Sequence, residues 1–271
     1  MQITDKFLRT ALRSYLRYKK ISLMEKIACI TGASSGIGWA TAQALAKEGY
    51  NLILCGRRME RLEALQSELP TDSYLLAFDV SDSTAVKLAF AQLPAAWQQI
   101  NVLINNAGNA HGMSPIQSGN EADWDAMMNS NVNGLLYVSQ AIIPGMIART
   151  SGHIINLSSI AGKQIYPNGN VYCASKAAVE ALTQGMRLDL NPYRIKVSSI
   201  APGAVNTEFS AVRFKGDLDR ANAVYQGFSP LVAEDVAEVI RYMVMAPAHV
   251  NLADVLLLPT AQASAAMIKR D

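Results

Sequence analysis

Residues 27–38 read IACITGASSGIG and decide the fold of this 271-residue chain. A short aliphatic run at 27–31 leads into a turn that holds Gly32, Gly36 and Gly38, and a helical pattern follows. Glycines between a strand and a helix let backbone N–H groups approach a pyrophosphate at the N-terminus of the helix. The spacing departs from GxGxxG, and a purely structural turn could use two of these glycines. The strand–turn–helix placement nevertheless favours a dinucleotide site.

The rest of the sequence alternates strand patterns with helical patterns. Aliphatic and β-branched runs predict seven strands, at residues 27–31, 51–55, 74–78, 102–105, 153–157, 195–200 and 255–258. Apolar residues three or four apart predict helices between them, at 38–48, 59–69, 83–93, 123–148, 171–191 and 234–245. This alternation requires crossover connections, so we predict an α/β fold: a Rossmann-like, doubly wound parallel sheet of seven strands, in a single domain at 24–271. The irregular segment 203–230 is the only long insertion, and we expect it to form a lid.

Composition and charge exclude several classes of protein. The chain is 50% hydrophobic and 17% charged, which excludes a disordered or fibrous protein. Its net charge of +2 is uneven, because residues 1–23 hold six basic residues and one acidic residue. The remainder of the chain is mildly acidic and has no basic footprint for nucleic acid. No apolar run reaches the roughly 18 residues that cross a bilayer, so we expect no membrane span.

The basic N-terminal extension at 1–23 has three interpretations. Its apolar residues recur at helical spacing between arginines, which fits either a mitochondrial-type targeting segment or a helix that binds a membrane surface or a partner. We favour the third, that translation begins at Met24. The three cysteines, Cys29, Cys55 and Cys173, are widely spaced, and neither they nor the histidines have metal-ligand spacing. We therefore expect no metal site and a protein of the reducing cytoplasm.

The end of the second predicted strand carries the signal for the cofactor. An NAD-specific site usually places an Asp or Glu here, for the adenine ribose hydroxyls. The sequence instead reads CGRR at 55–58. Arg57 and Arg58 offer guanidinium groups suited to a 2′-phosphate, and Ser34 or Ser35 could add a hydroxyl donor. Two solvated arginines that open a surface helix are the alternative. The pattern favours NADP over NAD.

Ser159, Tyr172 and Lys176 form a candidate catalytic group. Tyr172 and Lys176 are four residues apart, so on a helix they share one face. A neighbouring ammonium stabilises a phenolate and lowers the pKa of the phenol toward the range useful for proton transfer. Ser159 follows the strand at 153–157, where its hydroxyl could hold a substrate oxygen against the phenol. Taken singly, each residue also has an ordinary structural interpretation.

With the glycine turn, these residues match one family. The chain resembles the short-chain dehydrogenase/reductase family, whose TGxxxGxG turn corresponds to residues 31–38 and whose Tyr-x-x-x-Lys corresponds to 172–176. Ser159 lies 13 residues before Tyr172, the usual separation in the family. Four further family motifs follow in order: Asp79-Val80, NNAG at 105–108, Asn131 and Pro202-Gly203. The resemblance covers residues 26 to about 260.

The resemblance implies a role for each catalytic residue and a homotetrameric assembly. Tyr172 would be the general acid in reduction and the base in oxidation. Ser159 would position the substrate oxygen, Lys176 would bind the nicotinamide ribose and lower the phenol pKa, and Asn131 would hold a water that links Lys176 to solvent. The glycine turn, the arginine pair and the resemblance together predict these cofactor-binding residues: Gly32, Ser34, Ser35, Gly36, Ile37, Gly38, Arg57, Arg58, Asp79, Val80, Asn106, Ala107, Gly108, Tyr172, Lys176, Pro202, Gly203, Val205 and Thr207.

Short segments of the sequence indicate the class of substrate. The segments 208–210 and 212–216 look like those of the NADP-dependent 3-hydroxy acid dehydrogenases, which oxidise serine and L-allo-threonine and reduce malonic semialdehyde. Arg213 lies in the expected lid, where it could clamp a substrate carboxylate, although a solvated basic loop is the alternative. We expect Ser159, Tyr172 and Arg213 to bind a small 3-hydroxy acid such as serine or 3-hydroxypropionate. The rivals are an NADP-dependent carbonyl reductase for a bulkier ketone or acyl substrate and an inactive nucleotide-sensing protein.

Overall fold

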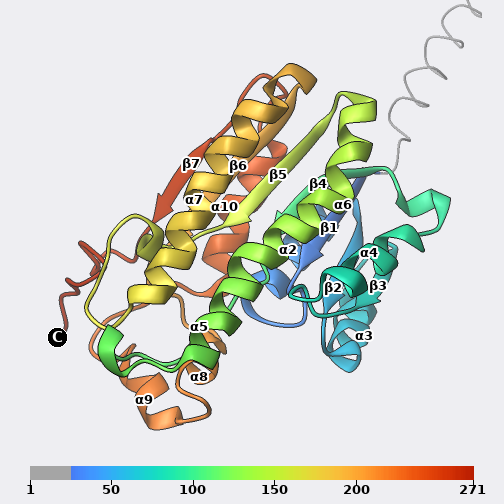
Figure 1. Ribbon diagram of the computed structural model, residues 1–271. Helices are drawn as coiled ribbons and strands as arrows, with labels where there is room; N and C mark the ends of the chain where they lie inside the picture. Colours follow the sequence, from blue (N-terminus) through green and yellow to red (C-terminus); the bar gives the residue numbers. More distant parts are fainter. Residues whose placement is uncertain (1–25) are drawn as a thin grey trace, which may run out of the picture.

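A seven-stranded sheet forms the centre of the protein, for which a computed structural model describes residues 26–271 (Figure 1). Its order is β3-β2-β1-β4-β5-β6-β7, and every neighbouring pair is parallel. The strands are β1 Lys26–Thr31, β2 Tyr50–Gly56, β3 Ser73–Ala77, β4 Ile100–Asn105, β5 Gly152–Leu157, β6 Ile195–Pro202 and β7 Asp254–Leu257. The chain order reverses between β1 and β4, as in a doubly wound fold. The predicted fold class is confirmed.

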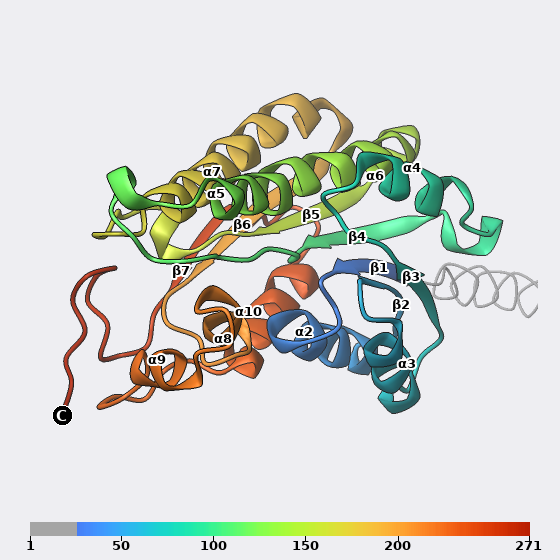
Figure 2. The same cartoon turned by 60° about the horizontal axis from the view of Figure 1, so that its bottom comes forward.

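Helices cover both faces of the sheet (Figure 2). The helices α4, α5, α6 and α7 lie on one side, and α2, α3, α8, α9 and α10 lie on the other. Their bounds are α2 Gly36–Lys47, α3 Met59–Glu68, α4 Ser83–Ala91, α5 Glu121–Met128, α6 Gly134–Arg149, α7 Asn170–Leu190, α8 Phe209–Arg213, α9 Leu218–Ala223 and α10 Ala233–Met245. Short 3-10 turns lie at Ala95–Trp97, Ile116–Ser118, Ile160–Gly162 and Asn191–Tyr193.

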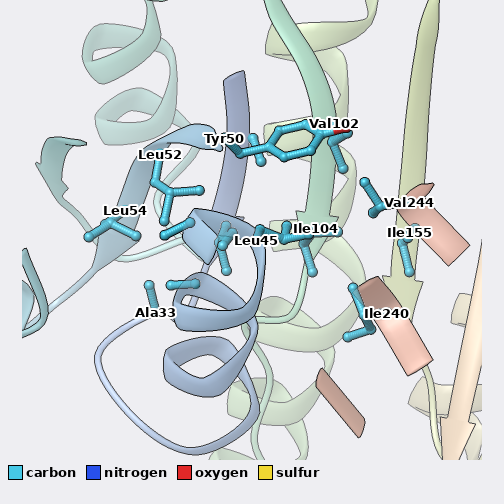
Figure 3. Close-up of a cluster of buried hydrophobic side chains, with 14 of the residues drawn as sticks. Ala33, Leu45, Tyr50, Leu52, Leu54, Val102, Ile104, Ile155, Ile240 and Val244 are labelled. Atoms are coloured by element: carbon cyan, nitrogen blue, oxygen red, sulfur yellow. The ribbon is translucent and has the colours of Figure 1, made fainter. Parts of the chain in front are cut away.

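The alternation of side chains along each strand produces two hydrophobic cores, one on each face. In β1, Ala28 and Ile30 point into the core under α2 and α10, whereas Ile27 and Cys29 point into the core under α4 and α6. Figure 3 shows the first core, where the Ile104 and Ile155 side chains from neighbouring strands meet Ile240 from α10. Burial on both faces explains why the strands read as continuous apolar runs.

Two segments differ from their predicted form. The predicted helix at 123–148 is divided into α5 and α6 by a π-helical stretch, Asn129–Asn133, because the Asn131 side chain bonds to backbone outside the helix. The predicted irregular segment 203–230 contains α8 and α9, and the side chain of Asp217 caps α9 through the backbone N–H of Arg220. The first difference involves a tertiary contact, whereas the cap of α9 is local.

No helix in the described part of the chain, 26–271, is long and apolar enough to cross a membrane. The basic extension at 1–23 lies outside the described residues.

Candidate active site

A cavity of about 890 Å³ opens where the carboxyl ends of β1, β2, β4, β5 and β6 meet. This volume is within the range of about 300–1,000 Å³ that is usual for small-molecule and cofactor sites. The cavity lies beside the β1–β4 reversal, the position at which open α/β sheets bind their ligands. The segment 203–213 and the C-terminal residues 262–270 form much of the wall opposite the sheet.

The three glycines of the turn lie at positions where a side chain would be strained or too crowded. Gly32 and Gly36 have φ values of +67° and +53°, which residues other than glycine rarely adopt. A Cβ on Gly38 would collide with the Gly32 carbonyl oxygen and come within 2.6 Å of the Asn106 side-chain nitrogen. The turn therefore keeps backbone N–H groups at the cavity wall without Cβ atoms in the way, which fits the pyrophosphate of a dinucleotide.

Thr31 and Asn106 tie the turn to the loop after β4. The Thr31 hydroxyl oxygen accepts hydrogen bonds from the backbone N–H groups of Asn106 and Ala107, each at 3.0 Å. In return, Asn106 Nδ2 donates to the backbone oxygens of Thr31 and Gly32, at 2.8 and 3.1 Å. These four bonds explain the second asparagine of the NNAG motif, because the Asn106 side chain sets the spacing between two loops that border the cavity.

Both arginines after β2 border the cavity, and each has an acidic neighbour. Arg57 Nη1 lies 3.6 Å from Asp79. The pKa of the Asp79 carboxyl is lowered, because hydrogen bonds from Ser81 and the charge of Arg57 outweigh its burial. Arg58 Nη2 lies 3.4 Å from the Ser34 hydroxyl, and the Arg58 guanidinium is paired with Glu208. A cluster of cationic and hydroxyl donors at this end of the cavity fits a phosphate group.

Tyr172 is buried on the first turns of α7, with Ser159 opposite it at the start of a 3-10 turn after β5. Burial raises the pKa of Tyr172 to about 12, although the Arg213 charge and the Ser159 side chain act to lower it. This result differs from the expected lowering by Lys176, because the sequence does not reveal the depth of burial. The phenol is thus held as a proton donor.

Lys176 lies one helical turn beyond Tyr172 and is also buried. Its Nζ donates a 2.9 Å hydrogen bond to the backbone oxygen of Leu157, at the end of β5. Burial lowers the pKa of Lys176 to about 8, and the nearby Glu180 carboxylate opposes this change. The ammonium therefore loses its proton within the range of pH in which enzymes are commonly assayed.

Asn131 lies behind the cavity wall, in the π-helical stretch. Its Oδ1 accepts from the backbone N–H of Asn109 at 2.8 Å, and its Nδ2 donates to the Asn109 oxygen and to Ser175 Oγ. A Cβ on Gly108 would lie 3.0 Å from Asn131 Oδ1 and 3.3 Å from Lys176 Nζ, so the side chains of Asn131 and Lys176 converge at this glycine.

Arg213, at the end of α8, covers the Tyr172 ring. Its guanidinium carbon lies 4.7 Å from the ring centroid of Tyr172 and 5.1 Å from that of Phe209. Its Nη2 donates to the Tyr166 hydroxyl at 2.9 Å, whereas its Nε is buried and has no partner within the described residues. The segment 203–230 thus brings a cation to the ring of Tyr172. Lys215, a second cation of this segment, is paired with Asp123 at 2.9 Å.

The sequence that builds this site matches one protein family. The family model described as short chain dehydrogenase matches residues 26–217. The chain belongs to the short-chain dehydrogenase family.

Individual short-chain dehydrogenases are similar over nearly their whole length. The chain is 41% identical to NADP-dependent 3-hydroxy acid dehydrogenase YdfG of Salmonella typhi, over 89% of this chain and 98% of that protein. It is 42% identical to serine 3-dehydrogenase of Rhizobium radiobacter, over 87% and 94%. Among solved structures, the closed form of serine dehydrogenase complexed with NADP+ superposes with a TM-score of 0.86 at 40% identity, covering 90% of this chain and 99% of that one.

Nearly all the residues predicted from the sequence line this cavity of the short-chain dehydrogenase. Gly38 and Asn131 do not line it, but each supports residues that do. Sequence reasoning missed Tyr166, which orients Arg213, and the C-terminal residues 262–270. Neither has a periodic pattern or a known spacing that could have revealed it. Among residues 26–271, no group of His, Cys, Asp and Glu side chains could hold a metal ion.

Proposed function

We propose that this short-chain dehydrogenase catalyses the reversible, NADP-dependent oxidation of the 3-hydroxyl group of small 3-hydroxy acids, such as serine, L-allo-threonine and 3-hydroxypropionate. The position of Arg213 beside Tyr172 is the observation that carries this proposal. Its guanidinium lies over the Tyr172 ring and the residue lines the cavity, so a carboxylate close to the reacting carbon would gain a charge-assisted hydrogen bond. The names of the relatives, which include NADP-dependent 3-hydroxy acid dehydrogenase and serine 3-dehydrogenase, support the same substrate class.

The residues that would hold NADP surround the cavity from end to end. The turn at 32–38 would bind the pyrophosphate, and Arg57, Arg58 and Ser34 would bind the 2′-phosphate. Asp79 would lie on the adenine side, and the ends of β4 and β6 would flank the nicotinamide half. The hydride chemistry itself is supplied by NADP when it is bound.

Tyr172, Ser159 and Lys176 would move and direct the proton. In reduction, the neutral phenol of Tyr172 donates its proton to the substrate oxygen, and in oxidation the phenolate takes the proton back. The Ser159 hydroxyl would hold that oxygen in place. The Ser159 side chain is itself positioned by a 3.1 Å hydrogen bond that its Oγ accepts from the backbone N–H of Ala161. The Lys176 ammonium would bind the nicotinamide ribose, and Asn131 would hold the water that returns protons to solvent.

A substrate panel tests this function. Purified protein is mixed with NADP or NAD and with L-serine, L-allo-threonine or 3-hydroxypropionate, and the absorbance of reduced nicotinamide is followed. We expect turnover with NADP, and much lower kcat/KM for 1,3-propanediol, which keeps the hydroxyl but lacks the carboxylate. No turnover of any hydroxy acid would refute the proposal. Faster reduction of a bulky ketone would instead favour a general carbonyl reductase.

We also propose a cytoplasmic homotetramer. The three cysteines, Cys29, Cys55 and Cys173, are buried and form no disulfide with one another, which suits a reducing compartment. Large apolar side chains are exposed on α7 and α10, including Leu188 and Tyr242, and such residues suit contacts between subunits. Light scattering of the purified protein should give four times the mass of the chain, and a monomer would contradict the proposal.

A further inference from the structure

Glu208 joins the lid to the arginine end of the cavity. It is the residue immediately before α8, so it lies at one end of the helix that carries Arg213 at the other. Glu208 Oε2 accepts hydrogen bonds from both Nη1 and Nη2 of Arg58, each at 3.2 Å, and its Oε1 lies 3.6 Å from Arg61. The two paired residues are 150 positions apart in the chain and both border the cavity.

The carboxylate of Glu208 occupies the part of Arg58 that an external anion would use. The two terminal nitrogens of a guanidinium form the fork that binds carboxylates and phosphates. In Arg58 both of them point to a single oxygen of Glu208, and Nη2 also lies 3.4 Å from the Ser34 hydroxyl. The fork of Arg58, which is assigned to the 2′-phosphate, is therefore already in contact with an anion from this chain.

We infer that Glu208 is a specificity-determining residue, an internal anion that competes with the 2′-phosphate of NADP for the fork of Arg58. This inference rests on the proposed NADP function. A 2′-phosphate and the Glu208 carboxylate repel each other at a shared cation, so the phosphate must displace Glu208 or share Arg58 with it. A dinucleotide without the 2′-phosphate leaves the Arg58–Glu208 pair intact. Glu208 thus lowers the affinity of the site for NADP but does not affect its affinity for NAD.

The competition also links cofactor binding to the lid. The Arg58–Glu208 pair holds the start of α8 beside the glycine turn, where Gly36 lies against the neighbouring Thr207 side chain. When a 2′-phosphate binds Arg58, Glu208 keeps only Arg61 as a paired cation in the described part of the chain. The phosphorylated cofactor therefore loosens one attachment of the helix that carries Arg213.

Glu208→Gln is a suitable test because the pair is half exposed, with side-chain exposures of 41% for Arg58 and 46% for Glu208. Exposed ion pairs contribute little to stability, so the variant is expected to fold, and an unfolding curve checks this. The matched control is Glu238→Gln, which removes a carboxylate paired with Arg241 on α10, away from the cavity.

The measurement is titration calorimetry at low salt with four ligands: NADP, NAD, and the fragments adenosine 2′,5′-bisphosphate and AMP. We expect Glu208→Gln to bind the two 2′-phosphorylated ligands about three- to tenfold more tightly, with NAD and AMP unchanged. The gain should shrink at high ionic strength, because salt screens a half-exposed charge. Glu238→Gln should change none of the four affinities.

The outcomes separate the inference from the proposed function. If the wild-type protein binds NADP and NAD equally, the assignment of NADP is wrong. If the wild type prefers NADP but Glu208→Gln binds it with equal or lower affinity, NADP is retained and Glu208 is not a competitor. In the case of lower affinity, Glu208 instead holds Arg58 in position for the phosphate.

Discussion

Gly38→Ala should displace the backbone of the glycine turn, and the distances in the structure give the approximate cost in free energy of unfolding. The added Cβ would collide with the Gly32 carbonyl oxygen and lie 2.6 Å from Asn106 Nδ2 and 2.8 Å from the Gly32 carbonyl carbon. Two of these atoms belong to the backbone and cannot rotate away, so the turn itself must move. Overpacking of this kind costs about 1–3 kcal/mol, which outweighs the gain of up to about 1 kcal/mol from placing alanine in a helix.

Gly185→Ala provides the matched control. Gly185 lies inside α7, and a Cβ there would meet nothing within 4 Å. The variant should therefore be more stable than the wild type, by about 0.5–1 kcal/mol. Urea unfolding measures both changes, and NADP titration measures the cofactor site. We expect Gly38→Ala to bind NADP at least about tenfold more weakly, since displaced N–H groups cannot reach the pyrophosphate, and Gly185→Ala to bind it normally.

The reasoning would be refuted by a Gly38→Ala variant that is as stable as the wild type and binds NADP equally well. Such a result would mean that the close approach of Gly38 to Gly32 and Asn106 is unimportant for the site. Destabilisation without loss of NADP binding would separate packing from cofactor recognition and refute the second half of the argument.

Three further predictions concern charges at the site. Arg213→Met should raise KM for 3-hydroxypropionate by about 10- to 100-fold, with little effect on KM for 1,3-propanediol, because it removes a charge-assisted hydrogen bond to the carboxylate. An equal rise in KM for both substrates would contradict the binding of the carboxylate by Arg213. Lys215→Met is the control. Arg57→Ala should weaken NADP binding about fivefold and leave NAD binding unchanged, and equal weakening in calorimetry would contradict a 2′-phosphate contact. Because the pKa of Lys176 is about 8, an unfolded chain binds a proton between pH 8 and 10 that the folded chain has released. The free energy of unfolding should therefore rise by about 2 kcal/mol over this range, relative to Lys176→Met, and parallel curves would contradict the lowered pKa.

The local parts of the site could be predicted from the sequence, since they depend on spacing alone. Tyr172 and Lys176 lie four apart and fall on one helix face, as expected, and the turn at 31–38 connects a strand to a helix. The apolar runs likewise predict the strands to within two residues, because burial on both faces demands such runs.

The remainder depends on contacts between distant residues, for which the sequence has no signal. The break between α5 and α6 arises because Asn131 bonds to the backbone of Asn109, 22 residues earlier. The contact of Arg213 with Tyr166 depends on how the segment 203–230 packs. The pKa of Tyr172 is raised because burial outweighs the neighbouring cation, and burial is a property of the whole fold.

The central claim is that Tyr172 exchanges the proton in an NADP-dependent dehydrogenase, and one comparison tests it most directly. The rate of NADP reduction with L-serine or 3-hydroxypropionate is measured for the wild type, for Tyr172→Phe and for Tyr166→Phe, with NADP affinity determined in parallel. We predict that Tyr172→Phe lowers kcat by at least about 100-fold while NADP binding is retained. Tyr166→Phe, which loses only the hydroxyl that orients Arg213, should act mainly on KM. Turnover by Tyr172→Phe at the wild-type rate would contradict the account.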